Sequence, residues 1–523
     1  MRLISVFLIL FYALFCQGQP QEIRFSSLKW TFRKASDSLA FPARIPGTVH
    51  TDLLNNGLIG DPFFGANEKE LQWIENETWI YETRVNLSEE ELKDKKARVI
   101  FEGLDTYATV YLNGNEVLRT DNMFRKWDQE ISKHLKTGSN TITVMFEPAA
   151  VMAKTKAATM PYTLPGGERV FVRKAQYQFG WDWSPRFITC GVWKEARILL
   201  YHDPFIKDVQ SYTLALTDTL AVVGLQITLS HPAEKDLMLC ATLGDSVTQS
   251  NDFVKINPGD SSCRLTLRIR NPQRWWCRGL GNAHLYTLTV QLKKGDRAIS
   301  EKKQSLGLRT LELVQEPDAQ GQSFFFRLNG IPVFAKGANY IPQDNFVTRI
   351  SDTQYRSLLQ KTAEANMNML RVWGGGIYEK DIFYDLCDSL GIMVWQDFMF
   401  ACAMYPGDSA FNNNVSEEVR EQTIRLRNHP CIALWCGNNE NDEGWKNWGW
   451  QKEYGYNRKD SVEIYHNYMK LFGTVIPQII AQNDSGRSYH PSSPATGWGR
   501  PDAYTTGDVH YWGVWWGMEP FEN

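Results

Sequence analysis

The sequence predicts a multidomain protein made of a β jelly-roll sandwich, an immunoglobulin-like β-sandwich and an incomplete (β/α)8 TIM barrel. Its 523 residues exceed the size of one ordinary domain. Short β-rich runs between turns continue to about residue 314, whereas apolar runs alternate with helical patterns after Phe324, which is typical of βα units. The expected domains are therefore 19–203, 204–314 and 315–523, preceded by a segment 1–18.

The first eighteen residues are typical of a secretory signal peptide. Arg2 precedes an apolar run, Leu3 to Phe15, that is too short to span a bilayer. Small residues stand at −3 and −1 of a cut before Gln19, which favours this cut over a lipoprotein cut before Cys16, where the bulky Phe15 would precede the cysteine. We expect a secreted or periplasmic protein with no membrane-spanning segment.

Composition excludes some partners and leaves others open. A net charge of −3 and a pI near 6.3 give no electrostatic case for nucleic acid or an anionic membrane. Aromatic residues make up 13% of the chain, which suits stacking on sugars or bases but also the cores of β domains. The eight cysteines after Cys16 form no Cys-x-x-Cys pair and no histidine stands at metal spacing, so we expect no metal or other cofactor.

Two β segments precede the change of pattern. In the first, Asn113-Gly114 is a strong hairpin signal because both turn positions need positive φ. The loop Phe179 to Pro185 places an acid between two indoles, and the residues alone favour a loop tucked against the sandwich edge. The second segment, about 203–314, has the size and strand spacing of an immunoglobulin-like sandwich, and nothing in it suggests chemistry. Its clearest expected strands are Val222–Leu229, Cys263–Ile269 and His284–Leu292.

The third segment reads as parallel strands joined by helices. Ser351 with Gln354 predicts a capping box, and Gly391 is expected to end a helix over Lys380–Leu390. The expected strands are Val333–Gly337, Met367–Trp373, Ile392–Asp397, Ile432–Cys436, Tyr489–Pro491 and Asp508–Trp512. A closed barrel of this type has eight strands, so six strands predict either an open sheet or, as we favour, a fragment.

The strongest chemical signal is the stretch Cys431 to Glu440. Ile432–Cys436 is a wholly apolar run of the kind that forms a strand buried on both faces, and it turns abruptly polar after Cys436. An α/β barrel places its chemistry at this end of its strands. Glu440 is therefore a candidate catalytic acid, and Asn439 a candidate for holding a substrate hydroxyl.

Several motifs, taken together, resemble one family. Their order and spacing are similar to those of the β-mannosidases of glycoside hydrolase family 2, over nearly the whole chain after residue 18. The motifs are Pro46–His50, Leu71–Trp73, Trp181–Trp183, Asn368–Gly376, Val394–Cys402 and Trp435–Glu440.

The resemblance implies a jelly roll, an immunoglobulin-like domain and a (β/α)8 barrel that removes β-mannosyl units from non-reducing ends with retention. It also implies roles for single residues. Glu440 resembles the general acid/base, Asn439 the residue that holds the 2-hydroxyl, and Arg371 an arginine that orients the nucleophile. Trp373 resembles an aromatic wall of the pocket, which Trp181 and Asp182 would close from the first domain.

A retaining glycosidase needs two carboxyls about 5–5.5 Å apart, one of them protonated. We expect an aromatic pocket and a charged partner to raise the pKa of Glu440. The nucleophile is expected in a Ser-Glu-Phe-Gly or Ser-Glu-Tyr-Gly motif, which does not occur in the 523 residues, and Glu519 and Glu522 are rejected because they follow the presumed sixth strand. The chain as given is therefore expected to be inactive.

Other interpretations stay open. Arg371 could be a structural ion-pair partner and Trp373 a core residue, whereas Asp397 is expected to stabilise the end of the sheet. His510 and Trp512 could line the pocket, or the histidine could be a core residue. The expected partners are β-mannoside oligosaccharides or glycans, with no nucleic acid. The alternatives are a β-glucosaminidase or β-galactosidase of the same family, or a non-catalytic carbohydrate-binding protein.

Overall fold

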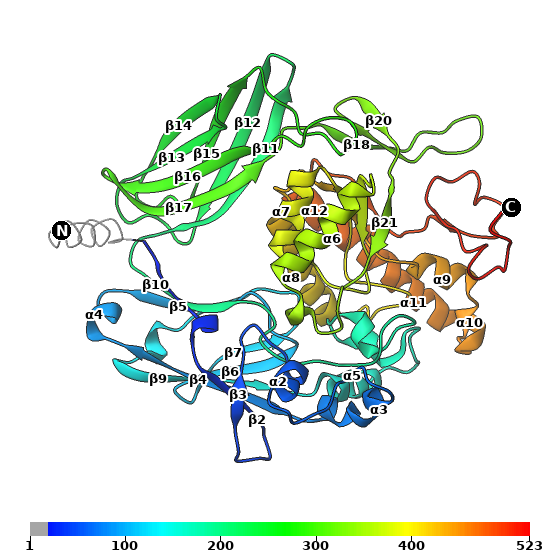
Figure 1. Ribbon diagram of the computed structural model, residues 1–523, viewed down its shortest axis with the longest axis horizontal. Coiled ribbons are helices and arrows are strands. Elements are labelled where there is room, and N and C mark those ends of the chain that lie inside the picture. Colours follow the sequence, from blue (N-terminus) through cyan, green and yellow to red (C-terminus); the bar gives the residue numbers. More distant parts are fainter. Residues whose placement is uncertain (1–18, 523) are drawn as a thin grey trace.

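The computed structural model describes residues 19–522 (Figure 1). The predicted signal segment 1–18 lies outside the described residues. Among those residues, no helix combines the length and apolarity that crossing a bilayer requires. In Figure 1 the N-terminal β domain (blue to cyan) lies below, the second β domain (green) lies at the upper left, and the helix-rich part (yellow to orange) lies to the right.

The first domain consists of two antiparallel sheets that share one core. Alternate residues of the central strand are buried from Trp79 to Leu87, which is the period-2 pattern of a sheet with one face inside. The predicted hairpin is confirmed, because Asn113 and Gly114 join two paired strands with φ of 52° and 82°. One sheet has the order β3 (Phe41–Ala43), β2 (Trp30–Lys34), β4 (Trp79–Leu87), β9 (Gly138–Phe146), β6 (Tyr107–Leu112), β7 (Asn115–Asp121). The other has the order β1 (Gln21–Arg24), β10 (Ala196–Tyr201), β5 (Lys96–Phe101), β8 (Trp127–Glu130). The helices are α2 (Val49–Asn55), α3 (Asn67–Glu70), α4 (Glu89–Leu92) and α5 (Ala149–Ala157).

The second domain is a smaller pair of antiparallel sheets around a separate core, as the sequence predicted. Its three clearest predicted strands are all present, as β12 (Leu220–Leu229), β15 (Ser262–Arg270) and β16 (Tyr286–Lys294). The sheets have the orders β11 (Ile206–Leu216), β12 (Leu220–Leu229), β15 (Ser262–Arg270) and β14 (Gln249–Ile256), β13 (Leu237–Gly244), β16 (Tyr286–Lys294), β17 (Arg297–Leu306).

A small antiparallel sheet links this domain to the helix-rich part, and it shows that one predicted strand was wrong. β18 (Leu311–Val314), β19 (Phe325–Leu328) and β20 (Ile331–Val333) form it, so residues 311–314 pair forward along the chain and not with the second domain. The predicted strand Val333–Gly337 is wrong. Its centre is irregular, with Phe334 82% exposed, because residues up to 333 pair with β19 and residues from 337 pair with a different sheet.

A five-stranded parallel sheet forms the third part. Its strands follow one another in chain order, and every residue of β23 (Met393–Asp397) and β24 (Ile432–Cys436) is buried, as expected for strands covered on both faces. The order is β21 (Gly337–Tyr340), β22 (Met369–Val372), β23 (Met393–Asp397), β24 (Ile432–Cys436), β25 (Tyr489–His490). The α-helices of this part are α6 (Asp352–Glu364), α7 (Asp381–Leu390), α8 (Ser409–Leu426), α9 (Asn441–Asn447), α10 (Trp450–Glu453), α11 (Arg458–Lys470) and α12 (Ile476–Asn483), and a π-helical stretch, Leu471–Val475, lies between the last two.

The predicted helix signals are confirmed, but the predicted sixth strand is not part of this sheet. Ser351 and Gln354 form a reciprocal capping box at α6, and Gly391 ends α7 with φ of 70°. Within predicted strand 508–512, only β27 (Val509–His510) is a strand. It pairs with β26 (Thr496–Gly497) in a separate two-stranded parallel sheet.

Helix α8 fastens the parallel sheet to the first domain. Arg173 donates two hydrogen bonds to the Glu418 carboxylate, at 2.9 and 2.7 Å, and both side chains are buried. Tyr378 and Asn122 also donate to Glu418, each at 2.9 Å. Since every donor is aimed at one buried carboxylate, this contact fixes the orientation of α8 on the first domain.

Candidate active site

Polar side chains gather where β22, β23 and β24 end. Arg371 lies in β22, Asp397 is the last residue of β23, and Asn439 and Glu440 follow β24. Beyond the strands, Ala401, Asn439 and Ser493 continue the parallel pairing as isolated bridges. This extra register keeps the chain extended up to Glu440, which turns into α9 with a left-handed φ of 63°.

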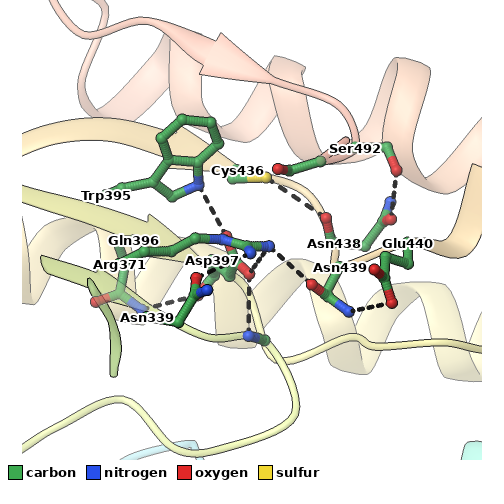
Figure 2. Close-up of polar contacts among 12 residues, drawn as sticks. Asn339, Arg371, Trp395, Gln396, Asp397, Cys436, Asn438, Asn439, Glu440 and Ser492 are labelled. Carbon is green, nitrogen blue, oxygen red and sulfur yellow. Dashed lines mark hydrogen bonds and ion pairs between the residues drawn. The ribbon is translucent and has the colours of Figure 1, made fainter. Parts of the chain in front are cut away.

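Arg371 and Asp397 form a buried ion pair at the centre of the group (Figure 2). The Arg371 Nη2 atom lies 2.9 Å from one oxygen of Asp397, and Nε lies 3.3 Å from the other. Asp397 also accepts from the Gly374 amide at 3.0 Å and the Trp395 indole at 2.9 Å. The carboxylate is thus fully engaged, in agreement with the structural role expected for it.

Asn439 connects this ion pair to Glu440, as Figure 2 shows. Its Oδ1 atom accepts from Arg371 Nη2 at 2.9 Å, and its Nδ2 atom donates to Glu440 Oε2 at 3.2 Å. The orientation of the amide is fixed from both ends, because a guanidinium only donates and an ionised carboxylate only accepts.

The Glu440 carboxylate is surrounded by hydrogen-bond donors. His510 Nδ1 lies 2.7 Å from Oε1, and the Cys402 thiol lies 3.3 Å from Oε2. Burial by itself raises the pKa of Glu440, but the hydrogen bond and electrostatic attraction of His510, the Cys402 thiol and the charge of Arg371 together hold that pKa below its ordinary value. The predicted direction was therefore wrong, because the donors outweigh the effect of burial.

His510 is the predicted pocket residue that the structure brings into direct contact with Glu440. Its Nδ1 atom carries the proton of this contact, since an ionised carboxylate can only accept. Its Nε2 atom lies 3.2 Å from Ser493 Oγ and 3.4 Å from Arg371 Nη1. Trp512, two residues further on, is 47% exposed, so the structure does not bury it in the same group.

The loop of the first domain that carries Trp181 reaches the end of β22. The Trp181 and Trp373 rings meet edge to face with centroids 5.0 Å apart, and Trp183 lies 5.9 Å from the same ring. The Tyr177 amide also donates to the Gly375 carbonyl at 3.1 Å. The loop is therefore an interdomain contact and not merely an edge of the sandwich. Asp182 is exposed at its tip, and its role in binding stays a prediction.

Sequence reasoning missed Cys402 as a member of the site. The residue falls in the motif Val394–Cys402, but its backbone φ of 46°, which aims the thiol at Glu440, depends on contacts with other segments. Asn339, which accepts from Arg371 Nη1 at 3.2 Å, was missed for the same reason. The predicted strand Val333–Gly337 ends before this residue, whereas β21 includes it.

A second group, Asp388, His429 and Cys431, has the donor types of a metal site and lies where β24 begins. The Asp388 carboxylate already accepts from His429 at 2.6 Å and from the Cys431 amide at 2.9 Å. Burial and the charge of Asp388 raise the pKa of the Cys431 thiol well above its ordinary value. These residues therefore fit a hydrogen-bonded lock between α7 and β24 better than a metal centre.

Comparison with known proteins gives a consistent result along the chain. Residues 30–194 match the family model for the glycosyl hydrolase 2 galactose-binding domain-like domain, and residues 206–309 match that for glycosyl hydrolases family 2. The β-mannosidase of Capra hircus and β-mannosidase B of Thermothelomyces thermophilus are each 35% identical, over 95% and 94% of this chain. The crystal structure of β-D-mannosidase from Dictyoglomus thermophilum superimposes with a TM-score of 0.89 at 40% identity, over 96% of this chain.

The chain spans about three fifths of the length of these relatives, namely 59% of both curated proteins and 61% of the solved chain. The two domain matches cover the two β domains described above, and the similarity to β-mannosidases continues through the parallel sheet and its site. The chain belongs to glycosyl hydrolase family 2, and over most of its length it is similar to β-mannosidases.

Proposed function

We propose that the protein hydrolyses terminal non-reducing β-D-mannose residues with retention of configuration, and that Glu440 is its general acid/base. One observation carries the proposal: an acid at the end of a buried parallel strand shares a continuous hydrogen-bonded group with Arg371, Asn439 and His510. The aromatic contact Trp181–Trp373 borders the same strand ends. The similarity to β-mannosidases, at 35–40% identity over most of the chain, supports mannose as the sugar.

The other residues receive roles from their positions. We assign Asn439 to the 2-hydroxyl of the sugar, because its amide is held between a guanidinium and the acid. Trp373 and Trp181 supply the aromatic wall, whose π faces suit a positively charged, oxocarbenium-like transition state. We further propose that Asp182, which is exposed at the tip of its loop, accepts hydrogen bonds from sugar hydroxyls.

We also propose that the second carboxyl of the retaining pair is not among the 523 residues. Asp397 accepts from three donor groups, and Asp508 accepts from His490 at 2.7 Å and from Ser493 at 3.1 Å. A carboxylate saturated in this way is a poor nucleophile. A second carboxylate near Glu440 would also raise the pKa of Glu440, since two close carboxylates resist ionising together.

The architecture and location are part of the same proposal. The five-stranded parallel sheet would be a portion of a (β/α)8 barrel, because its strands follow one another in order and the candidate site lies at their carboxyl ends. We further propose export through the signal segment 1–18, with a secreted or periplasmic product. Finding the full-length, unprocessed chain in the cytoplasm would contradict export.

The test uses the purified 523-residue chain and an activated substrate, 2,4-dinitrophenyl β-D-mannoside. Without a nucleophile we expect no turnover, whereas added azide should take the place of the missing carboxylate. Azide would attack the anomeric carbon from the opposite face and release 2,4-dinitrophenolate, leaving α-mannosyl azide. The β-galactoside and β-glucosaminide analogues should react much more slowly.

The outcomes separate the parts of the proposal. Turnover of the β-mannoside without azide would refute the missing nucleophile, and preference for another sugar would refute mannose as the substrate. If the chain neither binds the β-mannoside nor releases 2,4-dinitrophenolate when azide is added, no support for a glycosidase remains. Glu312→Gln is a suitable control variant, because Glu312 is an exposed partner of Arg327 in the small linking sheet.

A further inference from the structure

A stretch of the first domain lies directly against the segment that follows β23. The Met404 amide donates to the Pro165 carbonyl at 3.1 Å. Gly166 has a φ of 95°, and a Cβ added there would lie only 2.7 Å from the Cβ of Ala403. Only glycine allows the two backbones to approach this closely.

Arg169, three residues later, makes the polar part of this contact. Its Nη2 atom donates to the Cys402 carbonyl at 3.0 Å, and its Nη1 atom donates to the Ala401 carbonyl at 3.3 Å. Gln176 accepts from the same Nη1 atom at 2.8 Å, which fixes the guanidinium from its own domain. The guanidinium also lies over the Trp181 ring, 4.9 Å from its centroid.

Cys402 is the residue that this contact holds. Its left-handed φ of 46° is unfavourable for a side chain with a Cβ and persists only where surrounding contacts impose it. The Cys402 amide donates to the Asn439 carbonyl at 2.8 Å, while the Cys402 carbonyl accepts from Arg169 on the opposite side. The thiol then lies between Asn439 Nδ2 and Glu440 Oε2, 3.3 Å from each.

The thiol can only serve as a donor to Glu440. Burial, together with the negative charge of Glu440, raises the pKa of Cys402 well above its ordinary value, so the sulfur keeps its proton. A neutral thiol aimed at a carboxylate favours the ionised form of that carboxylate.

We propose that Arg169 is a positioning residue: it fixes the backbone of Cys402 so that the thiol donates to Glu440, and it supports Trp181 at the same time. The first domain would thus set both the protonation of the acid/base and the place of the aromatic wall. This inference rests on the proposed function for the role of Glu440, but the positioning itself is independent of it.

The first experiment measures positioning without any substrate. Amide hydrogen exchange of a peptide covering residues 398–405 is followed in the wild type, in Arg169→Gln and in Arg125→Gln. Arg125 is the matched control because it joins the same two domains through Glu421, at 3.4 Å, away from Cys402. We expect exchange of the Cys402 amide to rise about tenfold or more in Arg169→Gln and to stay at the wild-type rate in Arg125→Gln. Equal exchange in the two variants overturns the proposal.

The second experiment measures the consequence for Glu440. Binding of 1-deoxymannojirimycin, a mannose-configured cationic iminosugar, is titrated calorimetrically as a function of pH. Binding should weaken as Glu440 gains a proton, and Glu440→Gln should abolish this acidic limb. Both Arg169→Gln and Cys402→Ala should move the limb upward by about half a pH unit or more, because each removes a donor that favours the ionised carboxylate.

Conservative replacement separates donation from packing. Cys402→Ser keeps a donor at the same place and should retain the wild-type limb, whereas a limb unchanged in Cys402→Ala overturns the proposed donation. If the wild type binds no iminosugar, the proposed function fails, and the exchange result alone decides whether Arg169 positions Cys402.

Discussion

Replacing Asp397 with asparagine should destabilise the end of the parallel sheet strongly. Asp397 is completely buried and receives hydrogen bonds from Arg371, Trp395 and the Gly374 amide. All of these partners are donors, so the NH2 group of an asparagine at this position would face two of them. The substitution would also remove the negative charge that pairs with Arg371. Removing one partner of a buried ion pair costs about 3–5 kcal/mol.

The assay must report on this region, because a multidomain chain does not unfold in one step. Amide hydrogen exchange of peptides covering β22 and β23 serves this purpose, under conditions where exchange follows opening of the sheet. A loss of about 3–5 kcal/mol corresponds to exchange about 100-fold to about 4,000-fold faster. We expect this acceleration in Asp397→Asn.

The control is Glu312→Gln, which breaks an ion pair of 3.1 Å between side chains that are 60% and 34% exposed. A pair this exposed contributes less than about 1 kcal/mol. If Asp397→Asn accelerates exchange in β22 and β23 no more than this control does, the assignment of a structural role to the buried pair is refuted.

Three further predictions concern pH and domain contacts. Because the pKa of Glu440 lies below its ordinary value in the folded protein, the carboxylate stabilises the fold above about pH 4.5, and this contribution is lost as the pH falls through the folded pKa. In urea titrations, the free energies of unfolding of the wild type and of Glu440→Gln should therefore differ at neutral pH and converge in acid. Burial and the charge of Lys174 lower the pKa of His50 from 6.5 to about 3, so the neutral His50 stabilises the fold, and this contribution is lost as the pH falls from 6.5 towards 3. In urea titrations of His50→Phe, the free energy of unfolding should fall less steeply over this pH range than in the wild type. An equally steep fall would contradict the prediction. Glu418→Gln should weaken the contact between α8 and the first domain by about 3–5 kcal/mol. Calorimetry should then resolve separate unfolding transitions for the two parts, which unfold more nearly together in the wild type.

Features that depend on neighbouring residues could be predicted from the sequence. The capping box of Ser351 and Gln354, the Asn113-Gly114 turn and the glycine stop at Gly391 each depend on residues within one turn of chain. The buried strand Ile432–Cys436 was also predicted with its observed bounds, because five apolar residues bounded by polar ones leave little freedom.

Features that depend on distant partners could not be predicted. β21 begins at Gly337 because its partner β22 begins at Met369, and no local pattern records that register. The direction of the Glu440 pKa depends on His510, which is 70 residues away, and on Cys402, which is 38 residues away. The sequence thus pointed to Arg371, Asn439, Glu440 and His510, whereas Cys402, Asn339 and the distances within the group depend on contacts between segments far apart in the chain.

The buried contact between Arg173 and Glu418 also has a consequence during synthesis. The two residues are 245 positions apart, so Arg173 leaves the ribosome long before its partner exists. At roughly 5–20 residues per second, the delay is about 10 to 50 s. Throughout that interval the first domain must keep the Arg173 guanidinium in water, on a face that α8 later buries. This face of the first domain therefore stays in water until α8 is made.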